Sequence, residues 1–434
     1  MKRLYVIILA LSGCLAASAM DLTLQQCREM ALATDENLKI AENELHGAAL
    51  DKAVARTAYL PKIDGNATAL YRAPDSKIGD MMTMQIRGAY MAGINLTQPI
   101  YTGGKIWASN RMTDVAQEIS REQLRATRMD ILADAEKSYW TYVAVLSKID
   151  MTEAYLAMID SIYKVTECSV ETGMAEKNAL LRVNTRRSEI RYRLQQAKAG
   201  ADICRMSICR IIGVPDTTSV NPVGYSFGDD AAVPAESLSV GNRPETLILD
   251  KNIDVKRRQV DMARADFLPT VGLQLGWSAF GNLKMKGYAQ DETGNYVPFS
   301  STSDSNGFMG ILSVQIPIFH WGEGVKKVKR AKLDVENARL AKERNVRLMQ
   351  LEANQYYSNL QTGLQMIDAA KIAIDEADDN LSVMKDRYEV GLNTLTDMLE
   401  AQAQWQTSYS NLIEARTQYR INYVDYLRAI GALE

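Results

Sequence analysis

The sequence predicts a mainly α-helical fold with a few β-strands, in which one unit of two strands and a long helical hairpin occurs twice. Three observations predict this fold. Prolines are absent between positions 100 and 214 and after position 317. Landmark residues recur at a constant spacing of 218. The segments between the Leu-Pro and Pro-Ile landmarks alternate apolar with small or polar residues, as half-buried strands do.

The first 19 residues have the pattern of a secretory signal peptide, with a basic start, an apolar core over 4–11 and a small-residue ending. Two processing sites fit this segment. The ending Ala17-Ser18-Ala19 lies directly before the first helical pattern, "DLTLQQCREMAL", and favours cleavage there. The sequence "LSGC" is similar to a bacterial lipobox, which would leave a lipidated Cys14. We expect cleavage after Ala19, with lipidation of Cys14 as the alternative.

The composition excludes several classes of function. The formal net charge is −3, and a mildly acidic chain without a basic stripe argues against nucleic acid as a partner. The cysteines form no CxxC motif and no cluster with the two histidines, so we expect no metal site. No glycine-rich phosphate loop follows a predicted strand, and no nucleophile-elbow motif occurs. We therefore expect no enzyme, no catalytic residue and no cofactor.

The internal repeat is visible as matching landmarks. Pro99-Ile100-Tyr101 corresponds to Pro317-Ile318-Phe319, and Gly173 corresponds to Gly391. Before Pro99 the spacing changes to 208, since "YLP" at 59–61 corresponds to "FLP" at 267–269. This is a duplication, which is distinct from a short-period solenoid. The predicted organisation is a first structural repeat over 21–213 (a helix, a β-hairpin at 62–99 and a long helical hairpin at 104–213), a linker of irregular structure at 214–242, and a second repeat over 243–434 (a helix, a β-hairpin at 270–317 and a long helical hairpin at 322–431).

The two long proline-free spans predict long helices. Proline costs about 3 kcal/mol in a helix interior, so its absence permits them. The second span also carries an apolar seam with alternating steps of three and four residues: Tyr357, Leu360, Leu364, Ile367, Ile374, Leu381, Met384 and Tyr388. A helix from Val328 to Tyr388 would be roughly 90 Å long and needs a partner to cover that seam. We expect the partner to be the segment between Gly391 and Gly431, with Gly391 at the turn.

The segments between the landmarks predict β-hairpins. In "VGLQLGWSAF", at 271–280, apolar residues alternate with glycine, glutamine and serine, and "GFMGILSVQIP" shows the same alternation. Each repeat is therefore expected to hold two strands of about ten residues, the length of a tilted membrane strand. Polar, turn-rich tips are expected at 73–87 and 281–305. The alternative is a soluble two-stranded sheet packed on the helices, although an outward stripe including Trp277, Phe308, Leu312 and Val314 favours lipid.

Strands in a bilayer would require more than one chain. No segment after the signal peptide has about 18 uncharged apolar residues, so we expect no transmembrane helix. Backbone groups in lipid must all be paired, which requires a closed barrel, and the smallest outer-membrane barrels have about eight strands. Four strands cannot close alone. Two chains would supply eight strands and three would supply twelve, so this argument predicts an oligomer and leaves its order open.

The ordered set of these motifs resembles the TolC family of outer-membrane efflux proteins over residues 21–434. The set comprises "LTLQQCREMAL", "YLP", "QPIYTGG" and "ETGM", followed in the second repeat by "FLP", "IPIFHWG" and "YEVGLNTLTDMLEA". The resemblance implies a mainly α fold with membrane β-strands, assembled as a homotrimer with a 12-stranded β-barrel that a 12-helix periplasmic α-barrel continues. It places the chain in the cell outer membrane, in contact with lipid and with a long periplasmic extension. The implied partners are a periplasmic adaptor (membrane fusion) protein and an inner-membrane pump of the RND, ABC or MFS type.

The resemblance also implies roles for the two glycine turns. They would form the adaptor-docking tips at the periplasmic end, with the family's "VGL" pattern present as Val390, Gly391 and Leu392 and in altered form as Thr172, Gly173 and Met174. The alternative is a glycine that only ends a helix in the left-handed conformation.

The residues after Gly391 match the family's periplasmic aperture. The acidic positions fall on Asp397 and Glu400, which share a helix face and could form a ring of carboxylates that favours cations. Thr394 and Asp397 also form a capping-box pattern, and the two roles are compatible. The arginine expected after the turn is Asn393, and the acidic residue it would pair with is Ala179. Closure here is therefore expected to depend on packing and on other polar contacts.

The predicted function is the outer-membrane exit duct of a tripartite efflux or type I secretion system, which conducts substrates passively. A periplasmic coiled-coil scaffold is the alternative, and it would retain the helices without a membrane sheet. The tunnel width follows from the helix number, so this sequence does not choose between small toxic molecules, metal ions and proteins as the exported substrate.

Overall fold

The computed structural model describes residues 20–78, 82–223, 239–290, 292–293 and 295–433. The expected signal peptide, the alternative lipidation site Cys14 and most of the 214–242 linker lie outside these residues. The chain forms two compact units, which we describe separately. Unit 1 comprises Met1–Asn43, Glu122–Ile248 and Glu343–Glu434, and unit 2 comprises Glu44–Arg121 and Leu249–Lys342.

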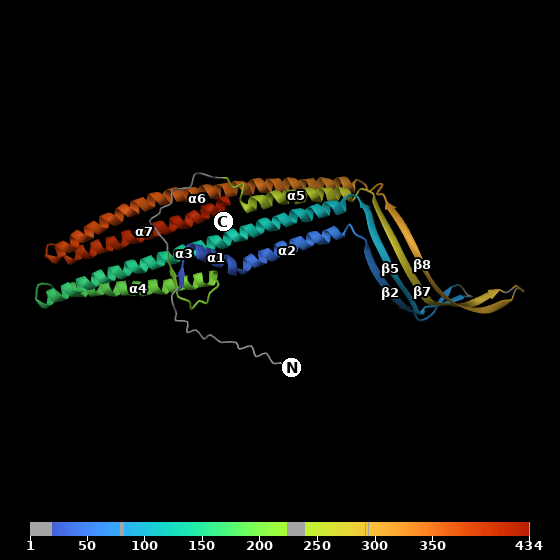
Figure 1. Cartoon of the computed structure of the whole chain (residues 1–434), viewed down its shortest axis with the longest axis horizontal. Coiled ribbons are helices and arrows are strands. Elements are labelled where there is room, and N and C mark those ends of the chain that lie inside the picture. The colour runs from blue at the N-terminus through green and yellow to red at the C-terminus, as the bar shows by residue number, and fades with distance from the viewer. Residues whose placement is uncertain (1–19, 79–81, 224–238, 291, 294, 434) are drawn as a thin grey trace, which may run out of the picture. The chain divides into compact units, whose positions relative to one another are not determined.

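The order of elements repeats the strand–strand–helical-hairpin pattern (Figure 1). The helices are α1 (Leu24–Thr34), α2 (Glu36–Thr57), α3 (Lys105–Glu171), α4 (Lys177–Ile211), α5 (Pro244–Ala265), α6 (Glu323–Glu389) and α7 (Leu395–Ile430). The strands are β1 (Met20–Leu22), β2 (Lys62–Tyr71), β3 (Ser76–Ile78), β4 (Met82–Gln85), β5 (Arg87–Thr102), β6 (Val220–Pro222), β7 (Thr270–Gln290) and β8 (Tyr296–Gln315). Helices α3 and α6 have 67 residues each and α2 and α5 have 22 each, with starts that differ by 218 and 208.

Two antiparallel helical hairpins, α3–α4 and α6–α7, dominate unit 1, and both turns lie at the left end of Figure 1. The predicted seam on α6 is buried against α7, where Leu360 and Ile367 pack with Tyr419 and Tyr426. Further along α6, Leu381 is buried in a cluster that also contains residues of α3 and α4. These contacts confirm that the segment after Gly391 folds back along the seam.

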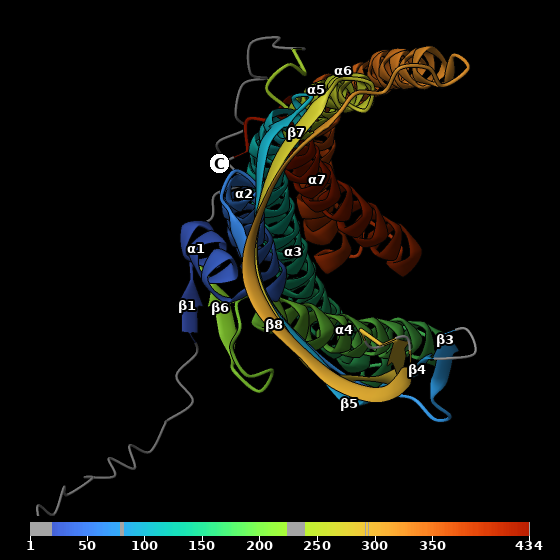
Figure 2. The same ribbon diagram turned by 90° about the vertical axis from the view of Figure 1, so that its right-hand side faces the viewer.

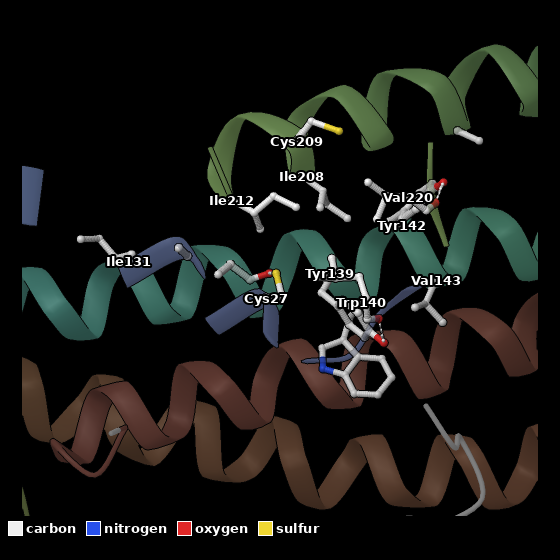
Figure 3. Packing of buried hydrophobic residues seen from close by; sticks show 14 of the residues in the cluster. Cys27, Ile131, Tyr139, Trp140, Tyr142, Val143, Ile208, Cys209, Ile212 and Val220 are labelled. Atoms are coloured by element: carbon white, nitrogen blue, oxygen red, sulfur yellow. Dashed lines mark hydrogen bonds between the residues drawn. The ribbon is translucent and has the colours of Figure 1, made fainter. Parts of the chain in front are cut away.

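The short helix α1 packs on α3 and α4 through an aromatic-rich core in unit 1 (Figure 3). Tyr139 is completely buried in this core, and its hydroxyl donates to the carbonyl of Leu22, 3.4 Å away. Cys27 is also completely buried, and this burial raises the pKa of its thiol to about 12. Cys27 therefore behaves as a small apolar residue, as its isolation in the sequence indicates.

The strands β1 and β6 pair in parallel beside this core, with Met20 opposite Val220. The 214–242 linker was expected to be irregular, so β6 is a correction to that expectation. The pairing partner lies 200 residues away in the sequence, and a three-residue strand carries no periodic signal of its own.

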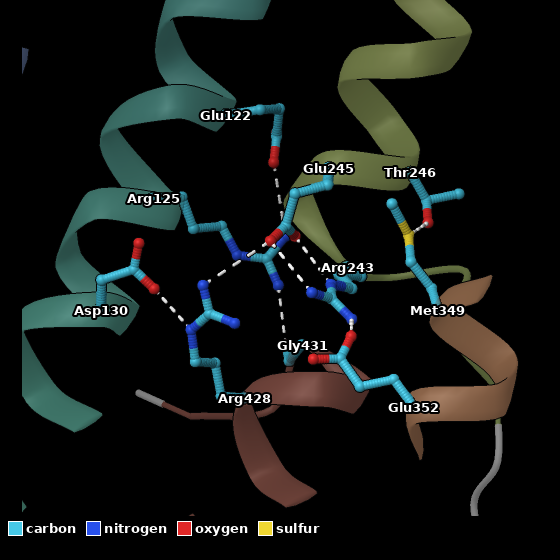
Figure 4. Close-up of polar contacts among 10 residues, drawn as sticks. All are labelled: Glu122, Arg125, Asp130, Arg243, Glu245, Thr246, Met349, Glu352, Arg428 and Gly431. Carbon is cyan, nitrogen blue, oxygen red and sulfur yellow. Dashed lines mark hydrogen bonds and ion pairs between the residues drawn. The ribbon is translucent and has the colours of Figure 1, made fainter. Parts of the chain in front are cut away.

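A cluster of ion pairs joins the start of α5 to α3, α6 and α7 in unit 1 (Figure 4). The Arg243 side chain is almost fully buried, and it donates to Glu245 at 3.0 Å and to Glu352 at 2.5 Å. Nearby, Arg428 on α7 pairs with Asp130 on α3. Because a buried guanidinium is costly without partners, these carboxylates fix where α5 begins.

Unit 2 contains one antiparallel sheet in the order β2-β5-β7-β8, with β3 and β4 attached to the far part of β7. Figure 2 shows the long strands curving together along their length. The pairing of β5 with β7 joins the two hairpins, with Ile94 opposite Trp277. Within the described residues, β2 pairs only with β5 and β8 only with β7, so both outer edges of the sheet are open.

Three strands are longer than predicted. The prediction of about ten residues holds for β2, whereas β5, β7 and β8 have 16, 21 and 20. The expected turn-rich tips contain paired strands, including β3, β4 and the pairing of Leu283–Gln290 with Tyr296–Ser303. The long apolar alternation stops near Ala279, and only Leu283 and Met285 alternate with lysines beyond it, so these extensions carry a weak strand signal in the sequence. Backbone hydrogen bonds between β7 and β8 hold these extensions together.

The helices of unit 2 lie in the same order as the strands that they continue. Lys52 of α2 pairs with Asp114 of α3 at 3.0 Å. The Arg258 guanidinium of α5 lies 5.4 Å from the ring centroid of Trp107 on α3. Ile253 of α5 is buried in one apolar cluster with residues of α6. The lateral order is therefore α2-α3-α5-α6.

The junction between β5 and α3 makes a close contact with the junction between α5 and β7. Gly103 has a left-handed φ of 65°, and a Cβ added to it would lie 2.5 Å from the Ala265 carbonyl oxygen. Its neighbour Gly104 is also left-handed, with a φ of 87°, but a Cβ there would meet nothing within 4 Å. Gly103 is therefore required both for its conformation and for the space that its missing side chain leaves.

We predict that Gly103→Ala destabilises the fold more than Gly104→Ala. Both changes cost about 1–2 kcal/mol for placing a side chain in the left-handed region. Only the first also forces a backbone shift, which adds about 1–3 kcal/mol. The midpoint temperature for loss of the helical circular dichroism signal in detergent measures both effects. Equal midpoints for the two variants would contradict the steric argument.

Candidate functional site: helical tips and an apolar sheet

Both helical hairpins turn through the same hydrogen-bond arrangement. The N–H of Leu392 donates to the carbonyl of Arg387 at 2.8 Å, and the N–H of Gly391 donates to that of Tyr388 at 3.0 Å. This pattern is a Schellman motif, with left-handed glycine at the position after the helix cap. The φ of Gly391 is 75°. The helix-ending role of this glycine is thus confirmed.

The first-repeat turn repeats these bonds. The N–H of Met174 donates to the carbonyl of Ser169 at 2.7 Å, and the N–H of Gly173 donates to that of Val170 at 3.1 Å. The residue after the glycine in a Schellman motif commonly packs back on its helix. Here both such residues face outward, since Met174 is 85% exposed and Leu392 is 70% exposed. Thr172 and Val390 are exposed as well. Each tip therefore presents an apolar side chain that its own chain does not cover.

The predicted capping box at the start of α7 is confirmed. Asp397 accepts from the Thr394 hydroxyl at 2.7 Å and from the Thr394 N–H at 3.1 Å, while its own N–H donates to the Thr394 hydroxyl oxygen at 3.2 Å. The hydrogen bonds from the Thr394 side chain and backbone hold the pKa of Asp397 below its usual value. Glu400 lies one turn further along α7 and is exposed, as Asp397 is.

The polar residue Asn393 does not replace the missing arginine with an ion pair. Its side-chain amide donates to the Met384 sulfur at 2.7 Å, which is a contact within the α6–α7 turn region. Ala179 lies in the first turn of α4 and is half-buried. The two positions where the family has an arginine and an acidic residue thus hold a neutral amide, Asn393, and an apolar side chain, Ala179.

A hydrogen bond that the sequence did not indicate links the two repeats near the tips. The hydroxyls of Thr166 on α3 and Tyr388 on α6 are 3.1 Å apart. Thr166 is almost completely buried. Tyr388 belongs to the predicted seam, but no periodicity or motif singled out Thr166. A threonine within a long helix carries no signal for such a distant partner.

An apolar core surrounds this hydrogen bond. Residues of both hairpins contribute, including the buried side chains of Tyr155, Ile159, Ile190, Leu381 and Met398. Trp405 of α7 packs on the same cluster, and its indole N–H donates to Asp378 of α6 at 3.1 Å. The two hairpins are thus joined near their tips by this packing and by the hydrogen bond between Thr166 and Tyr388.

The sheet of unit 2 has two chemically different faces. On one face lie Trp277 and its cross-strand partner Phe308, which is 72% exposed, together with Leu312, which is 64% exposed. On the other face the Asn95 amide donates to the Asn66 amide oxygen at 3.0 Å, above closely packed glycines. The predicted outward apolar stripe is therefore confirmed as exposed. The opposite face is more polar, although Met309, Ile311 and Leu70 are exposed on it.

No helix among the described residues is long and apolar enough to cross a membrane. The same part of the chain contains no group of three or more histidine, cysteine, aspartate or glutamate side chains that could hold a metal ion.

The chain belongs to the outer membrane efflux protein family, whose model matches residues 27–213 and 237–432. It is 23% identical over 446 residues to the outer membrane protein TolC of Escherichia coli, with 100% of this chain and 87% of that protein covered. It is 21% identical over 402 residues to the alkaline protease secretion protein AprF of Pseudomonas aeruginosa, with 90% and 80% covered.

Solved structures with the same fold include two outer-membrane channels. The CmeC channel of Campylobacter jejuni has a TM-score of 0.76 at 20% identity, with 95% of this chain and 86% of that chain covered. The open state of the MtrE channel of Neisseria gonorrhoeae has a TM-score of 0.77 at 17% identity, with 95% and 89% covered.

These findings confirm the predicted membership of the TolC family. The protein is located in the outer membrane and has a periplasmic extension. Its general role is that of an outer-membrane exit duct, and the proteins of its family are channels, which are not enzymes.

We predict that Thr394→Ala weakens the start of α7 by about 1 kcal/mol, because the cap supplies a hydrogen bond that alanine cannot replace. Amide-exchange protection at residues 395–398 measures the effect. Thr396→Ala, which leaves the cap intact, is the matched control. Unchanged protection in the Thr394 variant would show that the cap contributes nothing in solution.

The same cap should respond to acid. Because the folded pKa of Asp397 is lowered, its contribution is complete above the ordinary aspartate pKa of about 3.9 and is lost as the pH falls through the lower folded value. We therefore expect protection at residues 395–398 to fall only in strongly acidic solution. A loss of protection between pH 5 and 7 would contradict this assignment.

Proposed function

We propose that three copies of this chain form a closed outer-membrane duct. Their sheets would build a 12-stranded β-barrel, and their helices would continue it as a 12-helix periplasmic α-barrel. The observation that carries this proposal is the sheet of unit 2, which has an exposed apolar face, a more polar opposite face and, in the part of the chain that the structure describes, two open edges. A sheet of this kind suits lipid outside and water inside, provided that its edges are paired by other copies.

The number of copies is argued from size and family. A barrel of eight strands is filled by its own side chains, whereas a larger barrel leaves an aqueous passage. Two chains would contribute eight of the long strands and three would contribute twelve. A duct for molecules therefore favours three chains, which is also the number that the resemblance to the TolC family implies.

The alternative, a periplasmic coiled-coil scaffold, explains the helices but not the exposed stripe of Trp277, Phe308, Leu312 and Val314. The proposal requires detergent or lipid for solubility. Light scattering of the purified protein in detergent should give the mass of three chains, and planar bilayers should show ion conductance. A detergent-free, soluble monomer without conductance would support the scaffold.

The exposed tips are proposed to dock a periplasmic adaptor, which in turn would connect the duct to an inner-membrane pump. Met174 and Leu392 offer apolar contacts at corresponding positions of the two repeats. An adaptor could thus meet two similar sites on each chain. The relatives include a protease secretion protein and antibiotic and solvent efflux proteins, so their names do not select one substrate class. The susceptibility profile of a deletion strain, together with its secreted proteins, would separate these alternatives.

The carboxylates of Asp397 and Glu400 are proposed to form the aperture ring of the trimer, in addition to the cap that Asp397 makes. We predict that Glu400→Gln lowers the preference of the channel for cations, because it removes three charges from the trimer without touching the cap. Thr394→Ala breaks the cap and leaves the charges, so it serves as the control. Reversal potentials under a salt gradient measure the selectivity, and an unchanged value for Glu400→Gln would refute the ring.

Closure of the aperture is proposed to depend on packing and on the hydrogen bond between Thr166 and Tyr388, in place of an ion pair. We predict that Asn393→Arg combined with Ala179→Asp lowers the resting conductance, because the pair adds a charged contact where neutral groups now lie. Single-channel recording measures the change, with Asn393→Arg alone as the control. A double variant with unaltered conductance would count against this account of closure.

A further inference from the structure

The two repeats of the chain correspond residue by residue in their hairpins. In the first hairpin Lys62 lies opposite Thr97, and adding 208 and 218 to these numbers gives Thr270 opposite Gln315, which is a pair in the second hairpin. The same arithmetic converts the pairing of Ala69 with Tyr90 into that of Trp277 with Phe308. The duplication therefore preserves the strand register.

Because the register is preserved, the contact between the two hairpins of one chain can serve as a template for the contact between two chains. Inside one chain, β5 of the first repeat pairs with β7 of the second, and Ile94 lies opposite Trp277. The equivalent of β5 in the second repeat is β8, and the equivalent of β7 in the first repeat is β2. These two strands are the open edges of the sheet, and they run antiparallel to each other. In a ring of copies, β8 of one chain would meet β2 of the next.

From this correspondence we infer the register and the residues of the seam between two copies. The inference rests on the proposed assembly into a closed duct. The template pair Ile94–Trp277 converts into Leu312 of one chain opposite Ala69 of the next. The adjacent pair, Gly93–Ser278, converts into Ile311 opposite Leu70. This seam is the interaction surface, and its partner is a second copy of the same chain.

The faces of the two edge strands agree with this register. Leu312 lies on the apolar face with Trp277 and Phe308. Ala69 lies on the same face, because its partner Tyr90 is four residues from Ile94 on β5 and Ile94 pairs with Trp277. A shift by one residue would place Leu312 opposite Thr68 or Leu70, whose side chains belong to the other face of the sheet, and would exchange the faces of one strand. A shift by two residues keeps every side chain on its own face of the sheet, so an experiment must distinguish that register from the inferred one.

The loop after β8 provides a second, independent sign of a missing strand. β5 continues to Thr102 because β7 pairs with Tyr101 and Thr102. The corresponding residues Phe319 and His320 lie beyond the end of β8, and Ile318 is 92% exposed. A groove of about 630 Å³ lies beside them, lined in part by Phe267 and Val328. The segment 316–320 thus has the sequence of β5 without the neighbour that makes β5 a strand.

The helices next to the strands follow the same correspondence. The template contact of Trp107 with Arg258 converts into Val325 of one chain and Leu50 of the next. Both of these side chains are exposed and apolar in the single chain. This exposure is expected if Val325 of one chain and Leu50 of the next cover each other in the assembled ring.

The seam must differ from its template at one position. Gly103 corresponds to Trp321, which is 85% exposed and adopts a positive φ of 49°. In the template, even a Cβ at Gly103 would lie 2.5 Å from the Ala265 carbonyl oxygen. The junction between two copies must therefore be wider than the junction within one chain, and the Trp321 indole fills the added space beside residues 57–60 of the next copy.

Disulfide trapping tests the register. In a background where Cys27, Cys168, Cys204 and Cys209 are alanine, the test pair is Leu312→Cys with Ala69→Cys. The control pair is Leu312→Cys with Ala67→Cys, on the same face and two residues away. Within one chain these positions are separated by two strands, roughly 14 Å, so an intrachain bond cannot form.

A template pair calibrates the chemistry. Adjacent antiparallel pairs alternate between closer and wider Cβ separations, so one pair of any two neighbours suits a disulfide. If Ile94→Cys with Trp277→Cys forms an intrachain bond, the Leu312 pair is the informative one. If Gly93→Cys with Ser278→Cys forms it instead, Ile311→Cys with Leu70→Cys is used, with Ile311→Cys and Thr68→Cys as its control.

The expected result in oxidised outer-membrane vesicles is a covalent trimer as the main band for the test pair and mostly monomer for the control. A dominant band from the control pair, or from neither pair, in a protein that has the mass of three chains and conducts ions would overturn the register and leave the duct intact. A monomeric, non-conducting protein would overturn the proposed duct itself.

The role of Trp321 is tested by Trp321→Gly, with Trp321→Phe as the conservative control. Glycine restores the first-repeat residue and relieves the positive φ, so a purely local role predicts a more stable protein. Loss of the seam contact predicts the opposite, which is a lower temperature for dissociation of the trimer in mild denaturing detergent, with the phenylalanine variant close to the parent. Dissociation of the glycine variant at an equal or higher temperature would refute the contact.

Discussion

Backbone hydrogen bonding at the two open edges of the sheet governs the rest of this structure. In water an unpaired strand edge is hydrated at little cost, but in hydrocarbon each unpaired N–H or C=O costs several kcal/mol. Strands β2 and β8 present such edges beside an apolar face. With its sheet in lipid, as proposed, a single chain would therefore leave the backbone groups of both edges unpaired. Its strand order makes the edges antiparallel to each other, so copies can complete one another in a closed ring.

The helices are organised by the same constraint. In unit 2 the lateral order α2-α3-α5-α6 follows the order β2-β5-β7-β8, because each of these strands is joined directly to one helix at a Leu-Pro or glycine junction. In unit 1 the hairpins pack through α3 and α7, as the ion pair between Lys137 and Asp425 illustrates. Both hairpins end in the same Schellman motif. The position of each functional tip is thus a consequence of helix length and of one glycine, and no catalytic geometry is required.

Much of this architecture was readable from the sequence because it rests on repeated, periodic features. The α6 seam, the turn at Gly391, the Thr394–Asp397 cap and the apolar stripe through Trp277 all depend on local spacing. The missed features depend on distant partners. The polar ends of β7 and β8 are strands because they pair with each other, and β6 exists because of β1. The hydrogen bond between Thr166 and Tyr388 joins residues 222 positions apart, and no pattern in either helix predicts it.

The duplication has a consequence for how the duct comes together. The proposed ring consists of six structural repeats, two from each of three chains. The two repeats of one chain are already joined covalently, and they pack tightly at Gly103. Each covalent connection removes one bimolecular encounter and the loss of translational and rotational freedom that goes with it, which is worth about 4–15 kcal/mol per association. Only two such encounters remain for three chains, and together they form three junctions of the looser kind marked by Trp321. The ring would therefore dissociate first at the three junctions between chains. The three equivalent junctions within the chains would stay intact.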